Sequence, residues 1–243
     1  MILSDLANPV LIKPSKMALY LINHEGETSL GGHGDHGAIG VDLPCARKQL
    51  VDAARSFKVK DPGPMTAAEL FESITNGGMS DFGQVLAVLR QREVSWCLIG
   101  GLAVNCYVAP VYTADADFVV ATDMIDIVVQ GLAQGGFKIS QFEFSVNAQK
   151  PGSDLIIQLT RDERYQPFLT RAETREVLGC RIPVASLPDL IQGKIWAWQD
   201  PRRRLSKRTK DQADLLRIGE NHPALLHLLP DGFRQQLQEE QSE

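Results

Sequence analysis

The chain has 243 residues, of which 44% are hydrophobic and 23% are charged, and its formal net charge is -5. A chain of this length and composition can bury the core of one moderate domain or two small ones. The net negative charge argues against non-specific binding to duplex nucleic acid, although it leaves room for a local basic patch. No apolar run approaches the roughly 20 residues that span a membrane. No secretion-signal pattern is present, so we expect a cytoplasmic protein without membrane partners.

Residues 1–64 are expected to form an extended, loosely ordered N-terminal arm. Their apolar segments are short, and residues 24–40 are rich in Gly, His and acidic side chains without helical or strand periodicity. A Pro-Gly-Pro sequence ends this stretch, and Thr66 with Glu69 three residues later matches a capping box at the start of a helix. The folded core is therefore predicted to begin at residue 65.

Helices and strands alternate in the predicted core, residues 65–182, which is typical of an α/β domain. After a first helix, the periodicity predicts helices at 80–91, 102–107 and 123–134 and strands at 96–99, 137–146 and 154–159, with an aspartate-bearing strand between the last two helices. Residues 183–243 are predicted to be a helical C-terminal part, which begins with a helix capped by Ser186 and stopped by Pro201.

Asp115 and Asp117 interrupt an otherwise apolar strand. Successive side chains of a strand point to opposite faces, so these two carboxylates project from the same face. Two carboxylates held so close favour a raised pKa or a bound divalent cation, and oxygen ligands suit Mg²⁺ or Mn²⁺. The pair predicts a metal-dependent phosphoryl-transfer site, and the alternative is a solvated strand end.

Gly100 and Gly101 follow the buried strand at 96–99 and precede a short apolar helix. Glycine has no Cβ, so phosphate groups can approach its backbone closely, and the helix that follows offers free N–H groups. The pair is therefore a candidate phosphate cradle, and the alternative is an ordinary turn from strand to helix.

Four segments in order resemble the signature of the minimal nucleotidyltransferases of the DNA polymerase beta superfamily, especially the AbiEii-like toxin branch. They are Gly100-Gly101, Thr113-x-Asp115-x-Asp117, Asp189-Leu190-Ile191-x-x-Lys194 and Lys210-Asp211-x-x-Asp214-Leu215. The resemblance covers about half of the chain, residues 96–218. It implies an α/β nucleotidyltransferase-like fold with a mixed sheet.

The resemblance also implies an activity, transfer of a nucleoside monophosphate from an NTP to a hydroxyl acceptor, RNA or protein. A toxin of this branch implies an antitoxin partner. In the family two metal ions are bound by the aspartate pair and by a third carboxylate on a neighbouring strand. Asp154 is the candidate for that third position, because it begins the predicted strand at 154–159.

Further residues are assigned to nucleotide binding by the same resemblance: Gly100, Gly101, Thr113, Lys194 and Lys210. Lys194 is expected to bind phosphates with little effect on thermal stability, or else to be a surface lysine, and Thr113 either contacts the nucleotide or shapes its turn. Asp211 and Asp214 are expected to pair with Arg208 or Arg217 along their helix. The basic run at 202–208 suits RNA phosphates or a solvated loop equally well.

One position departs from the family pattern. Val111 stands where a basic residue is common two positions before the Thr, so the sequence also fits a degenerate, non-catalytic nucleotide-binding or protein-interaction module on the same fold. An Asp154 carboxylate close to the aspartate pair would favour the enzyme, and a displaced one would favour the module.

Overall fold

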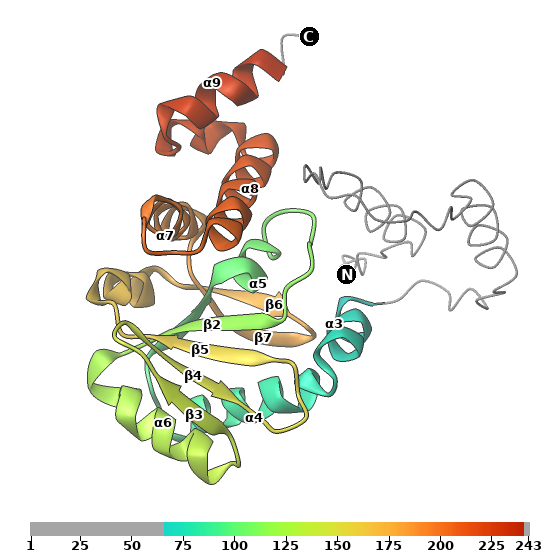
Figure 1. Ribbon diagram of the computed structural model, residues 1–243, viewed down its shortest axis with the longest axis vertical. Coiled ribbons are helices and arrows are strands. Elements are labelled where there is room, and N and C mark those ends of the chain that lie inside the picture. The colour runs from blue at the N-terminus through green and yellow to red at the C-terminus, as the bar shows by residue number, and fades with distance from the viewer. Residues whose placement is uncertain (1–65, 241–243) are drawn as a thin grey trace, which may run out of the picture. The chain divides into compact units, whose positions relative to one another are not determined.

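The computed structural model describes residues 66–240, and their strands form one seven-stranded sheet in the order β3-β4-β5-β2-β1-β7-β6 (Figure 1). The strands are β1 (Trp96–Ile99), β2 (Asp115–Val120), β3 (Lys138–Gln141), β4 (Ser145–Gln149), β5 (Ile156–Thr160), β6 (Glu173–Val177) and β7 (Cys180–Val184). Strand β2 runs parallel to β5 and β1 runs parallel to β7, whereas the other pairs are antiparallel. The predicted mixed sheet is confirmed.

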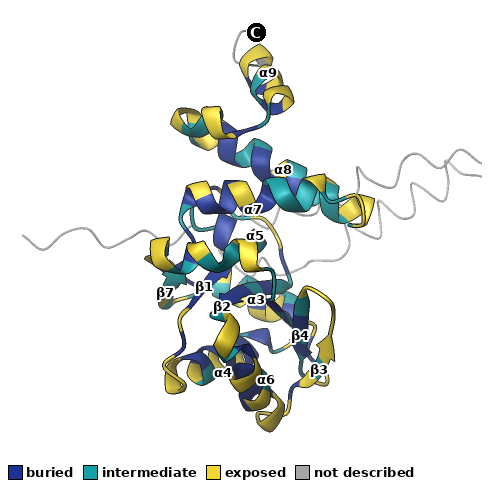
Figure 2. Ribbon diagram, turned by 90° about the vertical axis from the view of Figure 1, so that its left-hand side faces the viewer, coloured by how far each residue is buried: buried dark blue, intermediate teal, exposed yellow. Residues whose placement is uncertain are grey.

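Helices cover both faces of this sheet. They are α3 (Ala67–Thr75), α4 (Gly78–Gln91), α5 (Gly100–Val104), α6 (Ile125–Gln134), α7 (Leu187–Gln199), α8 (Leu205–Asn221) and α9 (Asp231–Glu240), with 3-10 turns η1 (Thr122–Met124), η2 (Glu163–Arg171) and η3 (Pro223–Leu228). Figures 1 and 2 show α4 and α6 on one side of the sheet and α7, α8 and α9 on the other. No helix among the described residues is long and apolar enough to cross a membrane.

The core between α4 and the sheet decides which way the aspartate strand faces. The apolar side chains of α4 recur at helical spacing, and its Phe82 lies with its ring centroid 6.1 Å from that of Phe118 on β2. Trp96 on β1 packs edge-on against the same Phe118 ring at 5.8 Å. Because alternate residues of a strand point to opposite faces, Asp115 and Asp117 are directed away from α4, toward α7 and α8.

Most predicted elements are confirmed, and two differ. The predicted strand at 137–146 is the β3–β4 hairpin, whose turn was missed because Phe142-Glu143-Phe144 contains no Gly, Pro or Asn. The β6–β7 hairpin was not predicted at all, although it extends the sheet beyond β1. The N-terminal arm predicted for residues 1–64 lies outside the described residues.

Candidate functional site

The turn from β1 into α5 brings Gly100 against Asp117. Ile99 at the end of β1 pairs with Asp117 on β2, and Gly100 adopts a positive φ of 72°. A Cβ added at Gly100 would lie 2.0 Å from Oδ2 of Asp117, which is closer than Cβ atoms in proteins approach non-bonded atoms. Gly100 is therefore required both by the backbone conformation and by the position of this carboxylate.

Asp115 and Asp117 share one face of β2, as expected, but their surroundings differ. Asp115 accepts a hydrogen bond from Lys207 Nζ at 2.9 Å, whereas the Asp117 carboxylate has no hydrogen bond or ion pair within the described part of the chain. Burial, together with the negative charge of Asp115, raises the pKa of Asp117 to about 6, against the opposing effect of the Lys194, Arg203 and Lys210 cations. An unpaired, half-buried carboxylate of this kind is favourable for binding a cation.

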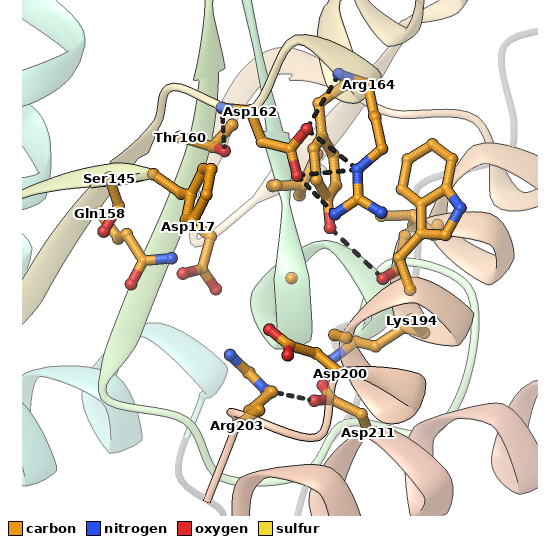
Figure 3. A pocket seen from close by; sticks show the side chains of 18 of the residues that line it. Asp117, Ser145, Gln158, Thr160, Asp162, Arg164, Lys194, Asp200, Arg203 and Asp211 are labelled. Carbon is orange, nitrogen blue, oxygen red and sulfur yellow. Dashed lines mark hydrogen bonds and ion pairs between the residues drawn. The ribbon is translucent and has the colours of Figure 1, made fainter. Parts of the chain in front are cut away.

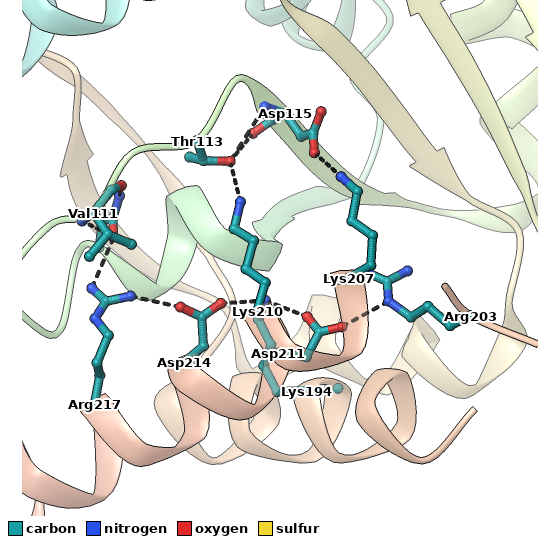
Figure 4. Close-up of polar contacts among 12 residues, drawn as sticks. Val111, Thr113, Asp115, Lys194, Arg203, Lys207, Lys210, Asp211, Asp214 and Arg217 are labelled. Atoms are coloured by element: carbon teal, nitrogen blue, oxygen red, sulfur yellow. Dashed lines mark hydrogen bonds and ion pairs between the residues drawn. The ribbon is translucent and has the colours of Figure 1, made fainter. Parts of the chain in front are cut away.

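Basic side chains from the helical part of the chain lie on the side of Asp115 and Thr113 (Figure 4). Lys207 and Lys210 lie one turn apart on α8, and Arg203 lies in the α7–α8 loop. Lys210 Nζ is 3.4 Å from the hydroxyl of Thr113, and burial, with Lys194 nearby, lowers the pKa of Lys210. Together they surround a cavity of about 90 Å³ lined by Gly101, Thr113, Asp115, Asp117, Gln158, Lys194, Arg203, Lys207, Lys210 and Asp211.

Lys194 lies beneath this cavity in a buried ion cluster. Its Nζ is 2.9 Å from Asp211 and 2.6 Å from Asp214, and the three side chains are 9%, 3% and 2% exposed. Burial by itself would lower the pKa of Lys194, but the carboxylates of Asp214 and Asp211 raise it. Arg203 contacts Asp211 at 2.8 Å and Arg217 contacts Asp214 at 2.7 Å, which extends the cluster to the surface.

The cluster decides how its charged side chains pair. Lys194 is not a surface lysine, because its buried Nζ forms ion pairs with two carboxylates, although it still lines both cavities. Asp214 does pair with Arg217, as predicted. Asp211 pairs with Lys194 and Arg203 instead of Arg208.

The structure does not bring Asp154 to the aspartate pair. Asp154 lies in the exposed turn before β5 and lines neither cavity of the site. Its backbone N–H donates to the carbonyl of Thr75, at the far end of α3. Across the β2–β5 pairing Asp117 stands opposite Gln158, four residues further on and on the order of 13 Å along the chain. The expected third carboxylate position is therefore held by an amide.

A larger cavity of about 540 Å³ opens beside Asp117 (Figure 3). Phe144 from the β3–β4 turn, 46% exposed, lies on one wall, and Arg202 from the α7–α8 loop lies over its ring at 5.2 Å from the centroid. The remaining lining residues are Ile99, Gly100, Asp117, Ser145, Gln158, Thr160, Asp162, Arg164, Tyr165, Phe168, Leu190, Gly193, Lys194, Trp196, Ala197, Asp200, Arg203 and Asp211. A cavity of this size can hold a nucleoside or the end of an acceptor chain.

Several residues of the two cavities were not assigned to the site from the sequence. Lys207 was considered only as part of the basic run at 202–208, although its position three residues before Lys210 places both lysines on the same helix face. The sequence did not identify Gln158 or Phe144 as site residues. The position of Gln158 depends on strand register, and that of Phe144 depends on a turn that was not predicted. Val111 is 43% exposed and lines neither cavity, whereas the basic side chains that line the smaller cavity come from α7, α8 and the loop between them.

The comparison with known families identifies the class of protein to which this fold belongs. Residues 121–242 match the family described as nucleotidyl transferase AbiEii toxin, type IV toxin–antitoxin system. The match spans half of the chain, so the protein belongs to this family of transferases. The matched segment starts directly after β2, which leaves the Gly100-Gly101 turn and the aspartate pair outside it.

Solved structures show similar chains at low sequence identity. The antibiotic-resistance factor ANT(2'')-Ia has a TM-score of 0.46 and 12% identity, over 67% of this chain and 90% of that one. The lincosamide antibiotic adenylyltransferase LnuA has a TM-score of 0.41 and 13% identity, over 56% and 94%. A nucleotidyltransferase-like protein from Paracoccidioides brasiliensis has a TM-score of 0.40 and 15% identity, over 56% and 73%. No curated protein matches the sequence.

Asp117→Asn is expected to stabilise the protein in a pH-dependent way. The folded state holds the pKa of Asp117 at about 6, above its ordinary value of 3.8, so ionised Asp117 opposes folding at neutral pH. The substitution should raise the free energy of unfolding at pH 7 by on the order of 2 kcal/mol. The gain should shrink as the pH falls from 6 and vanish below 4. Urea unfolding at pH 7 and pH 3.5 measures both values, with the exposed Asp154→Asn as the control that changes neither.

Lys194→Ala is expected to destabilise the protein, contrary to the expectation from sequence. It leaves Asp211 and Asp214 buried without their shared cation, which typically costs about 3 to 5 kcal/mol. Lys138→Ala, at an exposed site on β3, is the matched control and should cost almost nothing. Equal unfolding midpoints for the two variants would show that the buried cluster does not support the fold.

Proposed function

We propose that this protein transfers a nucleoside monophosphate from an NTP to a hydroxyl group of an RNA acceptor, with a divalent metal ion, as the toxin of a toxin–antitoxin pair. The observation that carries the proposal is the unpaired Asp117 carboxylate beside Gly100, with Lys207, Lys210 and Arg203 facing it across a small cavity. An anionic metal site directly beside a cationic cavity suits a metal-bound triphosphate.

The residues present fit one Mg²⁺ or Mn²⁺. Asp117 offers oxygen atoms that no described residue engages, and Asp115 offers a second carboxylate on the same strand face. Mg²⁺ is commonly held by one or two carboxylates and by substrate phosphates. When bound, such an ion would polarise the α-phosphate and offset its negative charge.

The transfer step exchanges one phosphorus–oxygen bond for another, and basic side chains of the protein stabilise the group that leaves. The acceptor oxygen forms a bond to the α-phosphorus while the bond from that phosphorus to the pyrophosphate oxygen breaks. Pyrophosphate leaves with the electron pair, and the hydroxyl proton is released to water. Lys207, Lys210 and Arg203 lie where they can hold the β- and γ-phosphates and stabilise the leaving charge.

RNA is the acceptor that the larger cavity suits best. Its lining combines the exposed ring of Phe144 with the Arg202 guanidinium, and Arg203 and Arg204 follow in the same loop. Aromatic rings that stack on bases, next to cations that contact phosphates, are typical of single-strand binding sites. A protein acceptor would leave this combination unexplained.

One observation favours a second candidate, a non-catalytic nucleotide-binding module. The displaced Asp154 and the amide of Gln158 leave the site without a third carboxylate, which is the condition under which the sequence favoured the module.

Labelling separates these candidates. Incubation with each α-labelled NTP, Mg²⁺, total RNA and a protein extract should label RNA. Asp117→Asn should abolish the label because it removes a metal-ligand charge, while Asp154→Asn should leave it intact. Label on protein alone would contradict the RNA assignment, and NTP binding without any label would support the module.

Lys207→Ala and Lys210→Ala should each weaken Mg-NTP binding by about 1 to 3 kcal/mol, the usual loss for a charge-assisted hydrogen bond. Calorimetry measures this loss, with Lys138→Ala as the control of equal charge change. Lys207→Ala also frees Asp115 from its ion pair, so it should not weaken binding of Mn²⁺ alone. A loss of metal binding in this variant would contradict the phosphate role of Lys207.

A further inference from the structure

An amide occupies the position beside Asp117 on the neighbouring strand. The β2–β5 register sets Gln158 directly opposite Asp117, and paired residues of neighbouring strands point to the same face. Gln158 lines both cavities, and its amide forms no hydrogen bond with another described residue. Figure 3 shows the amide next to the Asp117 carboxylate.

Every other carboxylate that lines the larger cavity already forms an ion pair with a basic side chain. Asp162 binds Arg164 at 2.7 Å, and Asp200 binds Arg202 at 3.4 Å. Asp211 is shared between Lys194 and Arg203. Within the described residues no three His, Cys, Asp or Glu side chains are grouped to hold a metal ion, so only the β2 pair is available.

The carboxylates that the chain itself supplies beside the metal position offset one divalent cation and not two. Two-metal centres hold their ions about 3.5 to 4 Å apart and need carboxylates to offset the repulsion between them. Here Asp115 and Asp117 supply two negative charges, and Lys207 already takes up part of that charge. Arg203, Lys194 and Lys210 add positive potential at Asp117. A neutral amide provides a dipole but no charge.

We infer that this site binds a single divalent cation together with the nucleotide, and that Gln158 is the residue that excludes a second one. The inference rests on the proposed nucleotide site and concerns how many metal ions that site binds. It assigns Gln158 to the acceptor side, where its carbonyl oxygen accepts a hydrogen bond from the incoming hydroxyl and orients it without taking its proton.

Counting bound Mn²⁺ tests the inference without relying on turnover. Full-length protein is mixed with an equimolar α,β-methylene NTP analogue, which cannot transfer its nucleotide, and free Mn²⁺ is followed by electron paramagnetic resonance. The wild type should bind one Mn²⁺ per ternary complex. Gln158→Glu should bind two, because its carboxylate supplies the missing charge beside Asp117.

Gln141→Glu on the exposed part of β3 is the matched control, because it adds the same charge away from the site and should keep the count at one. Two Mn²⁺ in the wild type would overturn the inference while leaving the proposed function standing. A count of one in a folded Gln158→Glu variant, checked by its melting curve, would overturn the role of Gln158. If that variant does not fold, the wild-type count decides. Absence of analogue binding at millimolar concentration would overturn the proposed function and this inference with it.

Discussion

The buried contact of Lys194 with Asp211 and Asp214 is the interaction on which the site depends. It joins α7 to α8 at the level of the aspartate strand, with N···O distances of 2.9 and 2.6 Å. Because burying charges is costly unless they are paired and oriented, the cluster permits few relative positions of the two helices. Arg203, Lys207 and Lys210 are carried by α8 and the loop before it, so this contact helps to hold them near Asp115 and Asp117.

The opposite situation holds at Asp117, where a half-buried carboxylate has no partner among the described residues. Its pKa of about 6 reflects a free-energy cost that the fold bears in the absence of a bound cation. Gly100 makes this arrangement possible, since any side chain there would displace the carboxylate. The site therefore combines a cluster of paired charges with one unpaired carboxylate, the kind of local conflict that is common at functional sites.

Local sequence patterns correctly predicted the features of the site that depend only on residues close together in the chain. Strand alternation correctly put Asp115 and Asp117 on one face, and the paired glycines correctly marked a tight turn next to them. Asp154 was assigned by sequence proximity to a predicted strand, but which residue faces Asp117 is set by the β2–β5 register. Register depends on non-local packing, so Gln158 was not identifiable from the sequence. The Lys194 role was missed for a similar reason, since its partners on α8 are 17 and 20 residues away and were expected to pair along their own helix.

Val111 and the α8 lysines together show how the site is divided along the chain. The loop before β2 provides no cation at Val111, whereas every basic side chain that lines the smaller cavity comes from residues 183–240. The sheet thus supplies the anionic side of the site and the helical part supplies the cationic side. In the proposed function, phosphate binding and metal binding would be divided between two segments that the Lys194 cluster holds in contact. The helical part would then be half of the proposed nucleotide site, because a sheet without it would keep Asp115 and Asp117 but lose the basic side chains proposed to bind the triphosphate.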